Sequence, residues 1–206
     1  MTLYCSLDLE TTGINALHTN ILEIGAVIDS TDGKQYEGTI RPEFHCYVVQ
    51  DLYTCDPYAA SMHPEIFKRI AEREKPFYYY SPNEAVFQLS LWLSVSWPKD
   101  QPVFFAGKNF AQFDLPFLRR LPGFEETISF HPSVLDPGPL FLDPLIDSKN
   151  PNLSVCCERA GLENHVTHTA LEDALQVSSL IQAYYAKRSQ RGWIWPKSKR
   201  KGGAER

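Results

Sequence analysis

Residues 3–13 read LYCSLDLETTG. The apolar part of this stretch, residues 3–9, predicts a buried strand. Asp8 and Glu10 stand two positions apart, so both side chains point to one face of that strand while the neighbouring leucines face the core. Two carboxylates on one face repel unless a cation lies between them, and Mg²⁺ or Mn²⁺ with oxygen ligands fits that need. Taken alone the Asp-x-Glu pattern is weak, because a chain of this length gives on the order of one such match by chance.

The segments that follow indicate an α/β domain. The apolar run Ile21–Ile28 predicts a second strand, and the Asp32-Gly33 step predicts a hairpin leading to a third strand near Gln35–Arg41. Strands and helices alternate afterwards, with a further strand over Gln101–Ala106. We therefore expect a mixed sheet, three antiparallel strands followed by parallel ones, flanked by helices.

Capping residues and prolines mark the helices. Ser81, Pro82 and Glu84 form a capping box that begins a helix, and Pro98 ends it. The other helices are expected over Pro64–Arg73, from Asp114 onwards, over Leu153–Ala160 and from Ala170 to about Lys187. Outside these elements, residues 42–80 and 122–151 are expected to be largely irregular.

Two further acidic segments begin helices. The first is NFAQFD, residues 109–114, and the second is HTALED, residues 168–173. In the second, a capping box makes Thr169 the N-cap and so places His168 and Asp173 at positions that touch across the helix start. An imidazole beside a carboxylate suits proton transfer next to a metal, although a local pair that merely orders the helix end fits equally well. Asp114 alone is a favourable carboxylate at a helix N-terminus.

Taken together, these segments resemble the DEDDh family of 3′→5′ exonucleases, which have an RNase-H-like fold. The resemblance covers about residues 3–186: residues 8–13 resemble the first motif, 109–118 the second, and 168–173 the third, with four residues between its histidine and aspartate. Residues 21–26 resemble the family's second strand. Lys108 departs from the pattern, because the family often has histidine there.

The resemblance implies a function and a set of roles. The chain would hydrolyse single-stranded DNA or RNA from the 3′ end to nucleoside 5′-monophosphates, with two Mg²⁺ or Mn²⁺ ions. Asp8, Glu10 and Asp173 would hold one metal, and Asp8 would bridge to a second. Asp114 would hold either a metal-bound water or that second ion, and His168 would be the general base. The implied substrate contacts are Leu9, Thr11 and Thr12 and, on weaker grounds, His63 and Asn109.

Charge divides the chain into two parts. Residues 1–186, the expected exonuclease domain, carry a net charge of −12, whereas residues 187–206 carry eight basic residues and one acidic one. This basic segment favours either a flexible solubilising tail or an electrostatic contact with nucleic acid. Its Trp193-Ile194-Trp195 triplet also suits a docking peptide for a polymerase or another protein.

Composition indicates which kind of protein the chain is and in which compartment it works. A hydrophobic share of 43% and an aromatic share of 13% argue against disorder. Five cysteines without a C-x-x-C pair favour a reducing, cytoplasmic setting, and we expect neither a signal peptide nor a membrane span.

Rival functions remain at this point. They are a polymerase-associated proofreading subunit, a nucleic-acid-binding scaffold that has lost catalysis, and a phosphohydrolase that uses the same metals on another substrate. The preference for RNA or DNA stays open. The oligomeric state also stays open, and a dimer is one of the possibilities.

Overall fold

The computed structural model describes residues 2–163 and 169–189. Its five-stranded sheet has the order β4-β3-β2-β1-β5. The strands are β1 (Leu3–Thr11), β2 (Ile21–Ser30), β3 (Glu43–Val48), β4 (Tyr79–Tyr80) and β5 (Phe105–Ala106). β2 is antiparallel to both of its neighbours, whereas β5 pairs parallel to β1 and β4 parallel to β3. The predicted α/β class and mixed sheet are confirmed.

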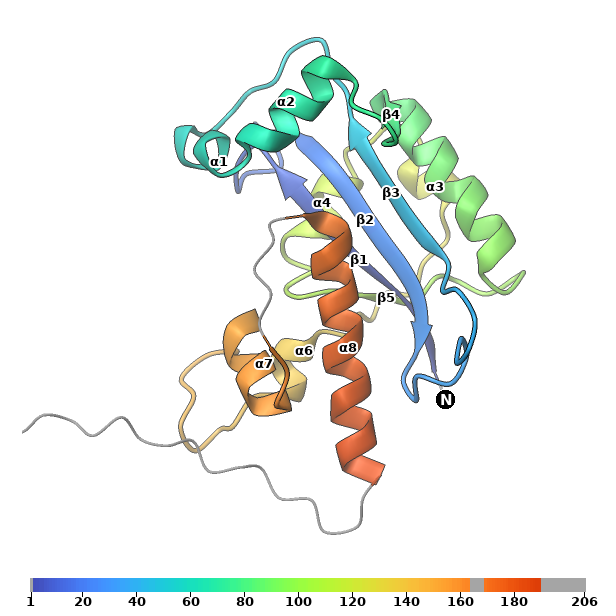
Figure 1. Ribbon diagram of the computed structural model, residues 1–206, viewed down its shortest axis with the longest axis vertical. Helices are drawn as coiled ribbons and strands as arrows, with labels where there is room; N and C mark the ends of the chain where they lie inside the picture. Colours follow the sequence, from blue (N-terminus) through green and yellow to red (C-terminus); the bar gives the residue numbers. More distant parts are fainter. Residues whose placement is uncertain (1, 164–168, 190–206) are drawn as a thin grey trace, which may run out of the picture.

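Helices cover both faces of this sheet. They are α1 (Pro57–Met62), α2 (Pro64–Glu72), α3 (Pro82–Ser96), α4 (Asp114–Leu118), α5 (Phe124–Thr127), α6 (Pro137–Leu140), α7 (Leu153–Ala160) and α8 (Ala170–Ser189). Figure 1 shows α2 and α8 in front of the sheet, with α8 running along β1 and β2 and α7 beside it. The predicted capping box at the start of α3 is present, and Gly161 ends α7 in a left-handed conformation.

Alternation along β1 assigns its side chains to the two faces. Leu7 and Leu9 are buried in the main core, together with apolar side chains of α3 and α4. Tyr4 lies on the other face, in a cluster with Val177 and Ile181 of α8. Because side chains alternate along a strand, the even-numbered residues of β1 all face α8, and the odd-numbered ones face the main core.

The third strand is not where the sequence predicted it. The expected strand over Gln35–Arg41 is a loop, in which Ile40 is 94% exposed, and β3 begins at Glu43 instead. The turn near Gly33 is therefore not a tight hairpin. The physical reason is burial: residues 34–41 are mostly polar, whereas Phe44, Cys46 and Val48 supply the alternating buried face that a strand needs.

Two other stretches also differ from expectation. Within the predicted Gln101–Ala106 only Phe105–Ala106 forms a strand, and Val103 makes an isolated bridge to Phe130. Pro102, which has no N–H to donate to a ladder, precedes this pairing. Residues 42–80, expected to be largely irregular, contain β3, α1 and β4 in addition to the predicted helix over 64–73.

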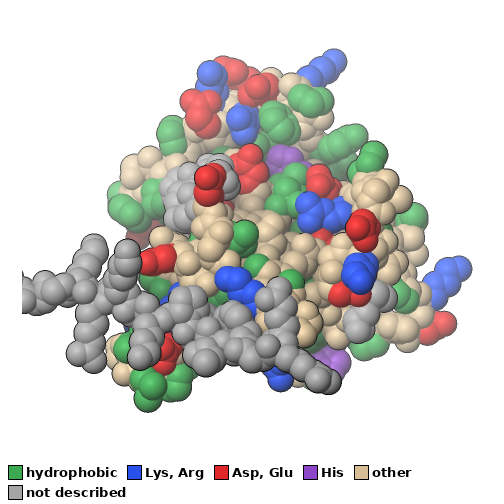
Figure 2. Space-filling view, turned by 60° about the horizontal axis from the view of Figure 1, so that its bottom comes forward, with side chains coloured by type: hydrophobic (Ala, Val, Ile, Leu, Met, Phe, Trp, Pro, Cys, Tyr) green, Lys and Arg blue, Asp and Glu red, His purple; other side chains and the backbone are tan. Residues whose placement is uncertain are grey.

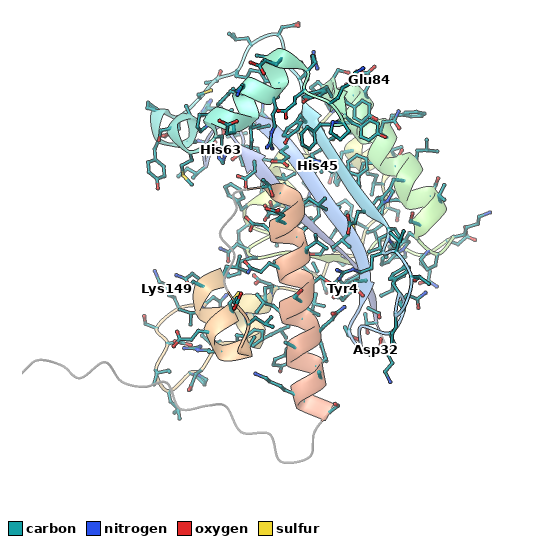
Figure 3. All side chains as sticks on the ribbon, viewed as in Figure 1. Tyr4, Asp32, His45, His63, Glu84 and Lys149 are labelled. Carbon is teal, nitrogen blue, oxygen red and sulfur yellow. The ribbon has the colours of Figure 1, made fainter. Side chains whose placement is uncertain are left out.

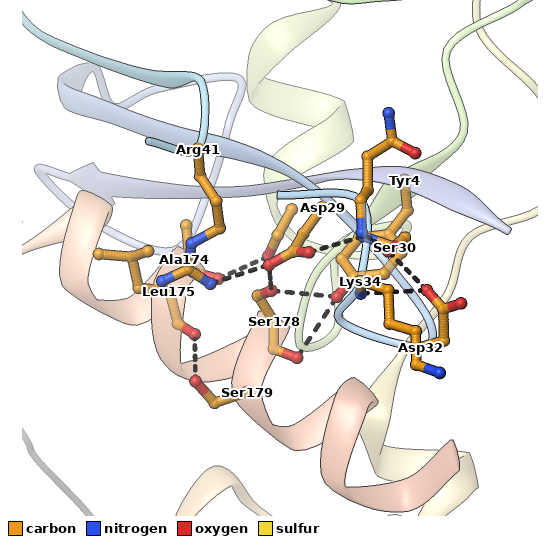
Figure 4. A network of polar contacts seen from close by, with 12 residues as sticks. Tyr4, Asp29, Ser30, Asp32, Lys34, Arg41, Ala174, Leu175, Ser178 and Ser179 are labelled. Carbon is orange, nitrogen blue, oxygen red and sulfur yellow. Dashed lines mark hydrogen bonds and ion pairs between the residues drawn. The ribbon is translucent and has the colours of Figure 1, made fainter. Parts of the chain in front are cut away.

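Polar contacts fix α8 on the sheet. The Ser178 hydroxyl lies 3.0 Å from the Tyr4 hydroxyl and donates to Asp29 Oδ2, also at 3.0 Å. Arg41 donates to the same Asp29 oxygen at 2.8 Å, so the buried carboxylate has a cationic partner. Figure 4 shows this network, which joins β1, β2 and the middle of α8.

Gly25 sets how close α8 comes to the sheet. A Cβ at this position would lie 2.1 Å from the backbone nitrogen of Leu171, a separation that real Cβ atoms essentially never show. One turn further along, the Ser6 hydroxyl donates to the carbonyl of Ala174 at 2.8 Å. Gly25 pairs with Asp8 in the sheet. The first turn of α8 therefore lies over the part of the sheet that carries Asp8.

Several sequence predictions concern the ends and the cysteines. α8 continues to Ser189, so the first three residues of the predicted tail are helical, and residues 190–206, with the Trp-Ile-Trp triplet, lie outside the described residues. All five cysteines are free. None of the described helices has the length and apolar composition that a membrane span requires.

Replacing Gly25 with alanine should disrupt this contact. We expect Gly25→Ala to lower the free energy of unfolding by at least about 2 kcal/mol, because the added methyl group forces the helix backbone away from β2. Urea unfolding followed by circular dichroism measures this change. The control is Gly38→Asn, where no atom lies within 4 Å and asparagine tolerates the left-handed backbone. A Gly25→Ala protein as stable as the wild type would show that the contact does not constrain the fold.

Candidate metal centre

Two of the predicted carboxylates come from the end of β1. Asp8 and Glu10 lie on the face of the sheet that α8 covers, since Leu7 and Leu9 point into the core on the opposite face. Glu10 is buried and Asp8 is partly exposed. The local pattern of apolar and acidic residues thus positions both carboxylates as predicted.

The third carboxylate comes from the first turn of α8. Asp173 offers a ligand oxygen that, with one oxygen each from Asp8 and Glu10, forms a set in which all atoms lie within 4.8 Å of one another. Thr169 directly precedes α8, and its hydroxyl donates to Glu172 at 2.8 Å, so the two residues of the predicted capping box do meet. His168, the predicted general base, lies outside the described residues.

Asp114 flanks this group from the other side of β1. It is the first residue of α4, it is fully buried, and its Oδ1 accepts a hydrogen bond from the N–H of Leu9 at 3.2 Å. Its other oxygen, Oδ2, is buried without a hydrogen-bond partner among the described residues. A buried carboxylate oxygen without a partner is costly, and a cation is one group that satisfies it.

Burial and mutual repulsion raise the pKa of three of these carboxyl groups. Loss of hydration raises the pKa of Glu10 to about 8, with the charges of Glu23 and Asp173 adding to the effect. Loss of hydration also raises the pKa of Asp114 to about 8. The pKa of Asp8 lies well above its ordinary value, again through burial first and then through its acidic neighbours. Divalent cations favour the deprotonated forms, so this all-oxygen donor set fits Mg²⁺ or Mn²⁺.

A second pair of acidic and imidazole groups adjoins the site and was not singled out from the sequence. Glu23 of β2 stands directly opposite Glu10 in the sheet, is fully buried, and lies 2.5 Å from Nε2 of His45. One glutamate inside the otherwise apolar run Ile21–Ile28 was a usable signal, because a buried carboxylate needs a partner.

Among the predicted substrate residues, His63 brings its side chain close to one of the carboxylates. It is 6% exposed, and its Nε2 lies 3.4 Å from Oε2 of Glu10. It stands between two helices, as the C-cap residue of α1 and the residue directly before α2. Figure 3 shows His63 on the side of α2 that faces the upper end of α8.

The threonines that follow Glu10 shape the loop beyond β1. The Thr11 hydroxyl donates to the carbonyl of Gly13 at 2.8 Å. The Thr12 hydroxyl donates to Thr54 at 2.6 Å and accepts from the N–H of Asn20 at 2.7 Å. Both hydroxyls are thus already hydrogen-bonded to other groups of the protein.

Leu9 and Asn109 are placed differently from each other. The Leu9 side chain is 4% exposed and belongs to the core, so its backbone is the part that reaches the site. Asn109 is exposed, has a left-handed backbone (φ 58°), and accepts from Nζ of Lys108 at 2.7 Å. It begins the turn that leads to Asp114.

Comparison with known proteins identifies the fold. No family model matches the chain, and no curated protein matches it. Among solved structures, the chain resembles E. coli Exonuclease I, described in complex with a dT13 oligonucleotide, with a TM-score of 0.60 and 14% sequence identity. The match covers 88% of this chain but 40% of that one. At this identity the likeness concerns the fold, and it confirms the predicted RNase-H-like architecture.

The raised carboxyl pKa values predict a fall in stability as the pH rises. Unfolded carboxyl groups titrate near pH 4, whereas Glu10 and Asp114 keep their protons up to about pH 8, so the folded protein binds more protons between these limits. Without metal, the melting temperature should therefore decrease from pH 5 to pH 8.5. Differential scanning calorimetry in EDTA measures this slope.

Two variants test whether the buried carboxyl groups cause the decrease of the melting temperature with pH. Asp114→Asn should flatten it, because one of the protonated groups is replaced by a neutral isostere. Asp147→Asn should not, because Arg159 holds the pKa of Asp147 at about 2, outside this window. A melting temperature of the wild type that stays constant from pH 5 to pH 8.5 would mean that Glu10 and Asp114 do not keep their protons in the folded protein.

Proposed function

We propose that the chain is a metal-dependent 3′→5′ exonuclease of the DEDDh type that acts on single-stranded nucleic acid and releases nucleoside 5′-monophosphates. The observation that carries the proposal is the convergence of Asp8, Glu10 and Asp173, which lie far apart in the sequence, with ligand oxygens within 4.8 Å of one another. The likeness of the fold to an exonuclease described with a bound oligonucleotide supports the same chemistry.

The carboxylates have separate parts in this proposal. Asp8, Glu10 and Asp173 would hold one cation, and Asp114, with Asp8 shared, would hold a second. Bound Mg²⁺ or Mn²⁺ supplies Lewis acidity to the phosphate and lowers the pKa of water. Asp114 is fixed by the Leu9 N–H, and Asp173 by the docking of α8 on Gly25, so the ligands are held before a cation arrives.

His168 takes the proton from the attacking water. The sequence pattern makes Thr169 the expected N-cap of α8, so residue 168 would stand one position before it, where it could touch Asp173. Neutral imidazole is required for this step, so activity should decline below about pH 6.5. His63 contacts Glu10 and would limit the space available to the terminal nucleotide.

A gel assay tests the proposed activity. The substrates are 5′-labelled single-stranded RNA and DNA of two to thirty nucleotides, incubated with Mg²⁺ or Mn²⁺, or with EDTA. The expected result is a metal-dependent ladder that shortens from the 3′ end and is absent for Asp8→Ala, since the shared ligand is lost. Tight binding without cleavage in either metal would overturn the exonuclease and favour a catalytically silent scaffold.

The role of His168 has its own test. His168→Ala should lower kcat by on the order of 10² to 10⁴ at pH 7.5, because general base catalysis is removed while the carboxylates remain. His131→Ala is the matched control, since that histidine is exposed and packs against Phe104, away from the carboxylates. Unchanged kcat in His168→Ala would remove the base from the mechanism.

A further inference from the structure

A groove of about 620 Å³ lies between the end of β5 and the loop that joins α6 to α7. Its lining includes two lysines and four neutral hydrogen-bonding side chains: Lys108, Asn109, Ser148, Lys149, Asn150 and Asn152. None of these takes part in the metal centre.

The sheet register places one wall of this groove next to the carboxylates. β5 runs parallel to β1, with Ser6 opposite Ala106, so Lys108 is level with Asp8 when the register is continued by two residues. Neighbouring strands lie about 4.8 Å apart. The chain does stay close here, because a Cβ on Gly107 would lie 2.8 Å from the carbonyl oxygen of Leu7. The wall of the groove that carries Lys108 therefore lies next to the carboxylates of β1.

The charge of the groove is positive. Its acidic lining residue, Asp147, is neutralised by two contacts with Arg159, at 2.5 and 2.8 Å. Lys108 lies 3.9 Å from Asp136. Lys149 is exposed and forms no ion pair with any described residue. Lys149 thus provides a cation that is available to a ligand.

The loop that carries Lys149 is held in place from both ends. Arg159 also donates to the carbonyl of Phe141, and the N–H of Asp143 donates to Asp147 at 2.8 Å. At the far end, Asn152 accepts from the N–H of Val155 and caps α7. A loop fixed in this way loses little conformational entropy when it binds a ligand.

We propose that this groove binds the sugar-phosphate backbone of the strand on the 5′ side of the scissile linkage, with Lys149 contacting a phosphate. The ligand class rests on the proposed function. Residues 1–186 carry a net charge of −12, so a polyanion needs local cations to approach. On the face shown in Figure 2, Lys and Arg side chains stand singly among acidic ones, so a single unpaired lysine matters. Figure 3 shows Lys149 beside α7, on the same side of α8 as His63.

Binding measurements test this assignment without turnover. In a His168→Ala background with Mg²⁺, we would measure the affinity for fluorescent single strands of two to ten nucleotides at several salt concentrations. Adding Lys149→Ala should weaken the binding of the longest strands about fivefold and reduce the slope of log Kd against log salt by about 0.7, the value for one phosphate contact on a single strand. The dinucleotide should bind as before.

Controls separate this contact from a general effect of charge. Lys149→Arg should retain the affinity, because it keeps the cation. Lys34→Ala removes an exposed lysine from the turn after β2, next to Asp32 (Figure 4), and should leave both affinity and slope unchanged.

Each remaining outcome decides one question. Unchanged affinity and slope in Lys149→Ala overturn the groove assignment, even when the wild type degrades single strands. An equal loss for the dinucleotide and the longest strand also overturns it, because Lys149 would then act at the metal centre. Weakened binding of long strands in a protein that cleaves nothing would keep the groove as a nucleic-acid site and overturn the proposed function alone.

Discussion

The first turn of α8 lies directly on the backbone of β2 at Gly25, and the candidate metal centre depends on that contact. Gly25 is paired with Asp8 across the sheet, so a helix that approaches this closely brings Asp173 to the carboxylates at the end of β1. Any side chain larger than hydrogen at residue 25 would hold the helix away. The polar network around Asp29 and Ser178 then fixes the same helix farther along its length.

This packing brings acidic groups together and removes them from water. The cost appears in the raised pKa values of Glu10 and Asp114, and in the buried oxygen of Asp114 that lacks a partner among the described residues. Glu23 extends the acidic region to β2, where His45 provides its partner. A protein that stores this much repulsion in one place gains from binding a divalent cation there, and sites of perturbed pKa are common where catalysis occurs.

Local patterns predicted much of the fold and the candidate site, and contacts between distant segments account for the rest. The positions of Asp8 and Glu10 on one face followed from strand alternation, and the start of α8 followed from its capping residues. The third strand was misplaced because the Asp32-Gly33 step suggested a tight turn, whereas burial of Phe44 and Cys46 decides where β3 lies. The approach of His63 to Glu10 joins residues 53 positions apart, and no local pattern reports such a contact.

Calorimetric titration with Mn²⁺ would show whether these carboxylates form a divalent metal site. The wild type should bind Mn²⁺ and release protons, seen as a binding enthalpy that changes with the ionisation enthalpy of the buffer, because carboxyl groups with raised pKa values must lose their protons. Asp8→Asn and Asp173→Asn should each lose most of that affinity, whereas Asp32→Asn, an exposed aspartate in the turn after β2, should bind as the wild type does. Equal Mn²⁺ affinity in all four proteins would mean that Asp8 and Asp173 do not bind the cation.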